Sequence, residues 1–528
     1  MRQVISILRV VWLPGAIASI YFFSWVSQSS FLVSWDVSWG LHEARRLLAG
    51  GVYGKDFFEP SPPMFLYLYS LPLIFSQLFL LNIEKVFRCY VFLLATMSLC
   101  GCYVFVRHIF NPCHVVFGKL FLLAITVIFL ILPLPFDFGQ REHLLVIFVF
   151  PYLLLIGLRL MGEYGHRYFG VLMALAAGIG FLIKPFFIIT FVLLELLYIY
   201  QRRDLWPWIK LELMIIASLA LGYLMVICYV HLEYITLVLP IVMKFYYQGV
   251  GDSFKELLMH PAIIYCFIVI GLFAFLSQYL TYKMLGAGLF TVLCGFLLVY
   301  FLQRTSWYYH LYPAYSIAFL LMIFLYGSVI TQKNISPRLS ISYVSLLVAG
   351  FLFILFPFCY SKMMYAVAIS YKDDALSLIR FMHYNAKHQP VYFLSAKLSV
   401  AFPAIDYAQV LPVSRFGSLS WVPGYVKLLQ QTTGHDLQNT IKQEGDILIN
   451  TVADEIMNYH PALILVDVSE HKPFMQGINF DYLAEFLQRP KFRMAWQSYQ
   501  FLTTLDKTPY YKLAVYQRRV IYTQSVSF

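Results

Sequence analysis

Charged side chains are scarce in this sequence. Aspartate, glutamate, lysine and arginine make up 12% of its 528 residues, whereas an ordinary soluble domain has about 25%. Hydrophobic residues make up 60%, and the mean hydropathy is +0.71. Apolar runs of about 20 residues recur, long enough to cross a hydrocarbon core of about 30 Å. A transmembrane barrel would instead show alternating segments of about 10 residues. The sequence therefore predicts a polytopic α-helical membrane protein.

Cysteine is absent from the polar C-terminal region, and we expect no disulfide framework in this chain. The sequence also has no Walker-type loop, no convincing dinucleotide fingerprint, no zinc-protease HExxH motif and no GxSxG motif. No motif therefore predicts an enzyme of those classes. The eight cysteines all lie in or beside apolar segments: Cys89, Cys100, Cys102, Cys113, Cys228, Cys266, Cys294 and Cys359.

The formal net charge is +11, but its distribution does not favour nucleic-acid binding. Lysine and arginine collect in short loops between apolar segments, as the signals that orient membrane helices do. We therefore expect membrane lipids, and no nucleic acid, among the partners.

Eleven apolar segments are predicted to cross the membrane. The segment 63–80 is shorter and contains Pro72, so we expect an interfacial helix that lies along the membrane. We expect the first segment to remain as a span rather than to be cleaved as a signal peptide, because its apolar run is long and lacks a clear cleavage site. The predicted spans are 8–27, 88–107, 114–133, 143–160, 168–183, 185–200, 211–231, 262–280, 285–302, 311–331 and 340–360.

The loop charges predict the orientation of these spans. With a cytoplasmic N-terminus, the following cations fall on the cytoplasmic side: Arg107, Lys119, Arg159, Arg167, Arg202, Arg203, Lys210, Lys283, Lys333 and Arg338. The outer side then receives 28–87, 134–142, 232–261, 303–310 and everything after 361. The unusual polar motifs all fall in or at the edge of these outer segments.

The C-terminal part of the chain differs in composition from the rest. Residues 371–528 are polar and mixed, with strand patterns at 391–396 and 462–468 and amphipathic helix patterns at 373–386 and 480–488. The stretches 491–505 and 510–519 are predicted as late, paired strands. We therefore predict a transmembrane domain over 1–360, with a first periplasmic loop at 28–87, followed by a periplasmic α/β domain over 361–528.

The first outer loop carries a group of acids behind the first span. Asp36 begins a stretch with apolar residues at approximately helical spacing, which Gly50 and Gly51 would end. An acid is favoured at a helix start, so one interpretation is an acidic surface helix. The other is that Asp36 is a general base, which takes the proton of a hydroxyl group as it attacks. Three further acids accompany it as candidate substrate-binding residues: Glu43, Asp56 and Glu59.

A second polar group lies in the segment 135–145. Four ionisable residues occur there within seven positions, at the outer end of a span, where such density is costly: Asp137, Arg141, Glu142 and His143. They are either a salt-bridge network that anchors the span or a second wall of the same polar site. In the second case Asp137 would bind substrate or a divalent cation, although the spacing is not a specific metal motif.

Cations at two further outer ends predict an anion site. Lys184 interrupts an apolar stretch before Pro185, and Arg304 and His310 are interleaved with aromatic residues that include Tyr309. Lys184 could extend to the interface without further function, and an aromatic belt would explain Tyr309. However, Arg304 lies on the side where positive residues are normally scarce. Lys184, Arg304 and His310 together could neutralise a phosphate leaving group.

These pieces, in this order, resemble the GT-C superfamily of membrane glycosyltransferases, and most closely the branch of protein O-mannosyltransferases and lipid A aminoarabinose transferases. The resemblance covers roughly residues 8–330. It rests on Asp36 after the first span, the segment GVYGKDF (51–57) with Pro62 and Pro63, Asp137 after the third span, Gly180 with Lys184 and Pro185, and Arg304 with Tyr309, His310 and Pro313.

The resemblance implies an inverting transfer from a polyprenyl-phosphate-linked sugar. Asp36 then resembles the catalytic base, Asp137 the second acid, and Lys184 and Arg304 the contacts to the donor phosphate. The Asp-Glu pair of the mannosyltransferases is Asp36-Val37 here, which argues against protein mannosylation.

We therefore predict a hexosyl or pentosyl transferase in a bacterial inner membrane, acting on the periplasmic face. The acceptor would be a glycan, a lipid or a protein, and a divalent cation is the one cofactor left open. The alternative is a transporter or flippase for a lipid-linked or anionic substrate. Transporters usually place charges near the bilayer centre and often show repeated halves, and this sequence shows neither feature.

Overall fold

The computed structural model describes residues 2–110, 114–133, 135–162, 167–202, 210–330, 340–472 and 474–519. The chain divides into two compact units. Unit 1 consists of Met1–Leu32, Ser61–Val230 and Asp252–Ala368, and unit 2 consists of Val33–Pro60, His231–Gly251 and Ile369–Phe528.

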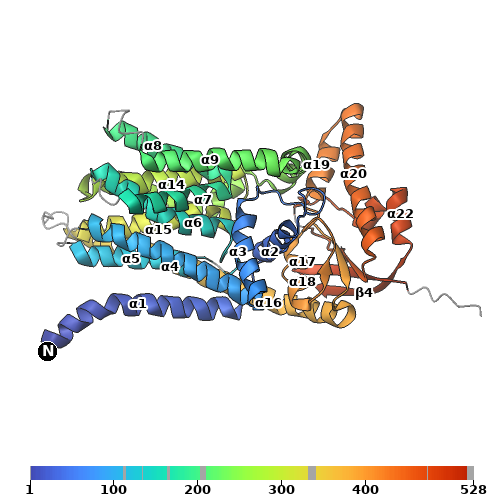
Figure 1. Ribbon diagram of the computed structural model, residues 1–528, viewed down its shortest axis with the longest axis horizontal. Helices are drawn as coiled ribbons and strands as arrows, with labels where there is room; N and C mark the ends of the chain where they lie inside the picture. Colours follow the sequence, from blue (N-terminus) through green and yellow to red (C-terminus); the bar gives the residue numbers. More distant parts are fainter. Residues whose placement is uncertain are drawn as a thin grey trace, which may run out of the picture. The chain divides into compact units, whose positions relative to one another are not determined.

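Unit 1 is a bundle of apolar helices (Figure 1). Its helices are α1 (Arg2–Ser30), α3 (Met64–Leu78), α4 (Ile83–Ile109), α5 (Val115–Leu130), α6 (Arg141–Met161), α7 (Arg167–Ile183), η2 (Pro185–Phe187), α8 (Ile188–Arg202), α9 (Leu211–Val230), α12 (Phe254–Met259), α13 (Pro261–Leu276), η6 (Ser277–Tyr279), α14 (Lys283–Gln303), α15 (Tyr308–Ile330) and the first part of α16 (Ser340–Ala386).

Helix α6 forms the centre of this bundle. It packs against α4, α7, α14 and α15, and almost every side chain along it is buried. A helix that is apolar all round is stable only inside a bundle or in a membrane. Ionisable residues lie at both ends of α6, and at each end one of them forms a buried ion pair.

Each of the eleven predicted spans coincides with a helix. Among the described residues, six helices are long and apolar enough to cross a membrane, or seven if a bent pair counts as one span. The expected multi-pass helical architecture is confirmed, while the number of eleven crossings remains a prediction. The segment 63–80 forms α3, and its position along the membrane also remains a prediction.

Two of the cations that were counted as orientation signals have buried partners in the structure. Arg159 at the end of α6 contacts Glu212 at 2.8 Å, and Lys210 contacts Glu195 at 3.0 Å. These pairs stabilise the junction of α6, α8 and α9. Because Arg159 and Lys210 are paired with buried acids, counting their charges overstates the evidence for the predicted orientation of the spans. Arg203, Lys333, Arg338 and Cys113 lie outside the described residues.

Unit 2 contains a five-stranded sheet in the order β2-β1-β3-β5-β4. Strands β1 (Pro390–Leu394), β2 (Leu411–Pro412) and β3 (Leu463–Asp467) are parallel, and β5 (Tyr511–Arg518) pairs antiparallel with β3 and with β4 (Tyr499–Lys507). The helices are α2 (Trp35–Leu48), η4 (Tyr234–Val238), α10 (Leu239–Ile241), η5 (Val242–Tyr246), α11 (Tyr247–Val250), the end of α16, α17 (Leu398–Ala401), α18 (Ala404–Ala408), α19 (Val422–Gln431), α20 (His435–Tyr459), α21 (Tyr482–Phe486) and α22 (Pro490–Trp496).

The predicted α/β character of the C-terminal region is confirmed, with one correction. The stretch 491–505 was predicted as a strand, but its first part is helix α22 and only Tyr499 onward is strand β4. Pro490 lies at the first helical position, where its fixed φ favours a helix. Phe492 and Ala495, three residues apart, are both buried, which is helical rather than strand spacing.

The first loop is an integral part of unit 2. Arg46 on α2 donates to the carbonyl groups of Ser414 at 2.9 Å and of Pro412 at 3.1 Å. Ser38 on the same helix donates to Asp406 on α18. These contacts join residues more than 360 positions apart and fix α2 against the C-terminal sheet domain.

Candidate active site

Lys184 lies at the centre of a buried polar cluster in unit 1. The residue directly follows α7 and has an extended conformation, as expected of a residue that precedes proline. Its ammonium group donates to the carboxylate of Glu142 at the start of α6, and Glu142 is fully buried. Nζ also lies 3.1 Å from Oε1 of Gln303 and 3.0 Å from Nε2 of His310. A single lysine thus connects the ends of four helices.

The proton on His310 can be assigned from its neighbours. Because an ammonium group only donates, Nε2 accepts from Lys184 and the ring proton lies on Nδ1, which donates to Oγ1 of Thr305. The ring of Tyr309 lies edge-on to that of His310 at 4.4 Å, and the ammonium of Lys184 lies 5.6 Å from the centre of the Tyr309 ring. All three hydrogens of the Lys184 ammonium group therefore have an acceptor within the cluster.

Arg304 lies on the turn between α14 and α15, between two residues of this cluster. Its backbone is left-handed, with φ +55°. The carbonyl of Arg304 accepts from the Asp252 amide at 2.8 Å, and the Asp252 carboxylate accepts from the Ser306 amide at 2.5 Å. The guanidinium is exposed and makes no hydrogen bond or ion pair with any residue that the structure describes. It is thus placed to meet an anion.

The remaining residues of the segment 135–145 serve different roles. Arg141 donates to Ser61 Oγ at 2.6 Å, and its guanidinium lies 5.3 Å from the Phe65 ring. Asp137 is buried and close enough to Tyr308 to interact with it electrostatically. In His143, Nδ1 accepts from the Gly139 amide and Nε2 donates to the Phe129 carbonyl. His143 therefore anchors the turn before α6, and we give it no part in the reaction proposed below.

The first-loop acids lie in unit 2. Asp36 is half-buried in the first turn of α2, and the predicted glycine stop is present. The Gly50 amide donates to the Leu47 carbonyl, and the Gly51 amide donates to that of Arg46, with Gly50 at φ +85°. The end of α2 is thus fixed by local sequence.

The other three acids of the loop differ in exposure. Glu43 and Glu59 are buried, with 0% and 4% of their surface exposed. Asp56 is exposed, and its carboxylate accepts from the Val52 amide at 2.7 Å, which closes the loop 52–56. Asp56 therefore has a structural role in the loop. His42 lies between Asp36 and Glu43 in the sequence. Burial of its ring lowers the pKa of His42 well below the usual histidine value, and the charges of Arg46 and Arg45 lower it further.

The structure thus brings Glu142, Lys184, Tyr309 and His310 into one cluster, with Arg304 beside it. Sequence reasoning missed Gln303 and Thr305, which complete this cluster. Gln303 and Thr305 flank Arg304 directly, so their position beside a singled-out residue was the available signal. Among the described residues, no group of three or more histidine, cysteine, aspartate or glutamate side chains could hold a metal ion.

The structure is similar to two crystal structures of ArnT from Cupriavidus metallidurans. The structure bound to undecaprenyl phosphate superimposes with a TM-score of 0.55 and 13% identity, and the apo structure with a TM-score of 0.57 and 14% identity. The chain has the fold of ArnT. Each match covers 96% of this chain and 98% of ArnT, so both units take part in it.

The resemblance expected from the sequence is confirmed at the level of the fold, which this chain shares with ArnT. No family model and no curated protein sequence matches this chain. At 13–14% identity, the two matches show the fold and not the roles of individual residues.

Proposed function

We propose that this protein is a membrane glycosyltransferase that moves a sugar from a polyprenyl-phosphate donor to a hydroxyl acceptor. The observation that carries the proposal is the match to ArnT over 96% of this chain, because ArnT has been crystallised with undecaprenyl phosphate. Because the loop charges predict that the polar motifs lie on the outer side of the membrane, we assign the reaction to the periplasmic face of a bacterial inner membrane.

The proposed reaction is a single inverting displacement. The acceptor oxygen forms a bond to the anomeric carbon, while the bond between that carbon and the phosphate oxygen breaks. The proton of the acceptor hydroxyl passes to the Asp36 carboxylate, and the bonding electron pair leaves with polyprenyl phosphate. Asp36 suits this role because it is half-buried and lies on a helix held in place by Arg46 and Ser38. A fixed carboxylate near an attacking hydroxyl contributes about 10²- to 10⁴-fold to a rate.

Arg304 is the residue that we assign to the departing phosphate. Its guanidinium is exposed and unengaged within the described residues, and a planar guanidinium binds phosphate oxygens in a bidentate way. Stabilising the charge that develops on the leaving group lowers the barrier directly.

Lys184, predicted from the sequence as a second phosphate contact, has a different role in this proposal. Its charge is balanced by buried Glu142, so little of its field is left for an incoming anion. Lys184 instead contacts Gln303 and His310, which lie on either side of the Arg304 turn. We therefore assign Lys184 and Glu142 to positioning that turn.

The lipid part of the donor would supply affinity without specific polar contacts. Each buried methylene contributes about 0.8 kcal/mol, so an isoprenoid chain that remains in the membrane holds the donor near the protein. The polar residues are then free to act on the sugar phosphate.

A donor panel tests the proposal. The purified full-length protein is incubated with polyprenyl phosphates carrying different labelled hexoses and pentoses, together with envelope glycans and lipid A as acceptors. We expect release of free polyprenyl phosphate and a labelled product with inverted anomeric configuration. If no donor is consumed while proteoliposomes containing the protein move a lipid-linked sugar across the bilayer, the protein is a flippase and the proposal is wrong.

A further inference from the structure

Asp252 holds the turn between α14 and α15 at two points. The amide of Asp252 donates to the carbonyl of Arg304 at 2.8 Å, and one carboxylate oxygen of Asp252 accepts from the amide of Ser306 at 2.5 Å. All three residues belong to unit 1. A single residue, 52 positions earlier in the chain, therefore holds the backbone at both ends of the segment 304–306.

The conformation of this turn depends on such contacts. Arg304 is left-handed, with φ +55°, and a residue with a Cβ atom is disfavoured in that conformation. On the buried side, Lys184 donates to the side chain of Gln303 at 3.1 Å. That contact holds the side chain before Arg304, whereas Asp252 holds the backbone of Arg304 itself. The direction in which the Arg304 side chain leaves the turn is therefore set by Asp252.

Asp252 is itself fixed by the helices on either side of the turn. Ser253 and Glu256 form a capping box at the start of α12, in which the Ser253 amide donates to the Glu256 carboxylate at 2.7 Å and the Glu256 amide donates to Ser253 Oγ at 3.3 Å. The hydroxyl of Tyr300 on α14 donates to the Leu257 carbonyl at 3.2 Å. The position of Asp252 is thus set by α12 and α14 together.

The Asp252 carboxylate binds the backbone and does not bind the Arg304 guanidinium. A carboxylate that paired with Arg304 would compete with a phosphate for the same hydrogens. Arg304 makes no ion pair with the part of the chain that the structure describes, and the bonded oxygen of Asp252 accepts from Ser306 instead. The base of the Arg304 side chain is therefore held while its guanidinium stays available.

We propose that Asp252 is a positioning residue, which holds Arg304 so that the guanidinium meets the phosphate of a polyprenyl phosphate. The identity of this lipid rests on the proposed function, but its binding does not require turnover. Asp252 acts as a hydrogen-bond acceptor and not through its charge, because a negative charge near the site repels a phosphate. The variant Asp252→Asn therefore keeps the role, since its side-chain oxygen still accepts from the Ser306 amide.

Lipid binding to the full-length protein in phosphatidylcholine nanodiscs tests this inference. The probes are a polyprenyl phosphate and the uncharged polyprenol with the same chain, titrated separately and measured by native mass spectrometry. Because the two lipids share their chain, the ratio of their dissociation constants reports the phosphate contact. We expect the wild type to prefer the phosphate more than tenfold, Asp252→Ala to lower this preference at least tenfold, and Asp252→Asn to keep it. Polyprenol binding should be the same in all three proteins.

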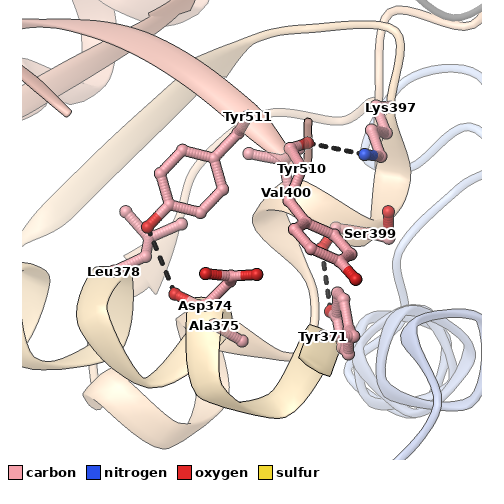
Figure 2. A pocket seen from close by; sticks show the side chains of 9 residues that line it. All are labelled: Tyr371, Asp374, Ala375, Leu378, Lys397, Ser399, Val400, Tyr510 and Tyr511. Carbon is pink, nitrogen blue, oxygen red and sulfur yellow. Dashed lines mark hydrogen bonds between the residues drawn. The ribbon is translucent and has the colours of Figure 1, made fainter. Parts of the chain in front are cut away.

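A double-mutant cycle shows whether Asp252 acts through Arg304. The variant Arg304→Gln removes the guanidinium, so we expect it to lose the preference and the double variant with Asp252→Ala to lose nothing further. The matched control is Tyr511→Phe in unit 2. It removes one hydrogen bond between distant segments, from the Tyr511 hydroxyl to the Asp374 carbonyl at 3.2 Å (Figure 2), and should keep the wild-type preference.

Four results would overturn the inference. They are a wild type without preference for the phosphate, an unchanged preference in Asp252→Ala, a preference lost as fully in Asp252→Asn as in Asp252→Ala, and a further loss on adding Asp252→Ala to Arg304→Gln. Thermal melting checks that each variant is folded. If Asp252→Ala is not, Asp252→Leu takes its place, because leucine has a similar shape and no acceptor.

The transfer assay separates this inference from the proposed function. If the binding ratios change as expected but no donor is consumed, the proposed function is wrong and the positioning role of Asp252 stands. If sugar is transferred while Asp252→Ala keeps the wild-type preference for the phosphate, the positioning role is wrong and the proposed function stands.

Discussion

At the scale of single residues, Arg304 combines a costly backbone with an exposed side chain. A left-handed conformation costs a residue other than glycine about 1–2 kcal/mol, and such conformations persist at functional sites. We predict that Arg304→Gly leaves stability unchanged or raises it by about 1 kcal/mol, while sugar transfer falls at least tenfold. Thermal melting and the transfer assay measure the two effects.

A matched control separates backbone from side chain. Gln409 is also left-handed, with φ +57°, and it ends the short helix α18 in unit 2. Gln409→Gly should give a similar gain in stability with full transfer activity. Full activity in Arg304→Gly would show that Arg304 does not bind the phosphate.

His42 predicts how the stability of unit 2 depends on pH. Its ring stacks on Trp39 at 5.6 Å, and burial together with Arg46 and Arg45 lowers its pKa well below 6.5. In the unfolded chain His42 gains a proton as the pH falls through about 6.5, whereas in the folded protein it stays neutral. Stability is therefore complete above pH 6.5 and is lost below it, by at most about 1.4 kcal/mol per pH unit.

The variant His42→Phe keeps the aromatic packing and removes the titrating group. We expect its melting temperature to fall less than that of the wild type between pH 7 and pH 5. If the melting temperatures of the two proteins fall equally over this pH range, His42 is not responsible for the loss of stability.

The sequence predicted some individual residues well and others only in part. Asp36 at a helix start and Gly50 at the helix end follow from local signals within about 15 residues, which is why both were found. The pairing of Lys184 with Glu142 joins positions 42 residues apart, and nothing in the sequence distinguishes a balanced lysine from one that is free to bind phosphate. The importance of Gln303 and Thr305 likewise appears only when four helix ends are brought together.

At the scale of helices, the Lys184–Glu142 pair connects the ends of α6, α7, α14 and α15. Lys184→Met would leave the fully buried Glu142 carboxylate without its cation. Removing one partner of a buried ion pair typically costs about 3–5 kcal/mol. We therefore predict a large drop in the melting temperature of unit 1, much of which the double variant Lys184→Met/Glu142→Gln recovers. Unchanged stability with lost activity would instead support Lys184 as a direct phosphate contact.

The segment 231–251 meets α19 through two glycines in unit 2. A Cβ atom on Gly424 would lie 1.8 Å from the Phe245 carbonyl oxygen, and one on Gly249 would lie 2.7 Å from the Gly424 amide nitrogen. A backbone oxygen cannot move aside as a flexible side chain can. We predict that Gly424→Ala destabilises unit 2 by about 3 kcal/mol and makes residues 231–251 sensitive to protease.

Gly434 offers the control for this substitution, because a Cβ atom there meets nothing within 4 Å. Gly434→Ala should change stability by at most about 1 kcal/mol and leave the protease pattern unchanged. Equal protease resistance of Gly424→Ala and the wild type would contradict the close packing described here.

The apolar helices were predictable as elements, since an apolar run of about 20 residues has few alternatives in a membrane. Helix α22 was not, because its aromatic residues favour a strand by propensity while the proline before them and the three-residue spacing of buried positions favour a helix.

At the scale of the whole molecule, the sequence predicted a helix bundle and a C-terminal α/β region, and the structure has both. The sequence did not predict that 33–60 and 231–251 belong to the same compact unit as the C-terminal region. Those segments are joined to it by Arg46, Ser38 and the Gly249–Gly424 approach, which are long-range contacts between short and unremarkable stretches. The predicted catalytic aspartate is thus carried by unit 2 rather than by the helix bundle.

The proposed function requires Asp36 to act as the base of a sugar transfer from a polyprenyl phosphate. The most direct test is the rate at which full-length wild-type protein and the Asp36→Asn variant release polyprenyl phosphate from a labelled donor in the presence of acceptor. We predict the same melting temperature for both proteins and a release rate at least about 10²-fold lower for Asp36→Asn. Release at the wild-type rate by the folded variant would show that Asp36 is not the base.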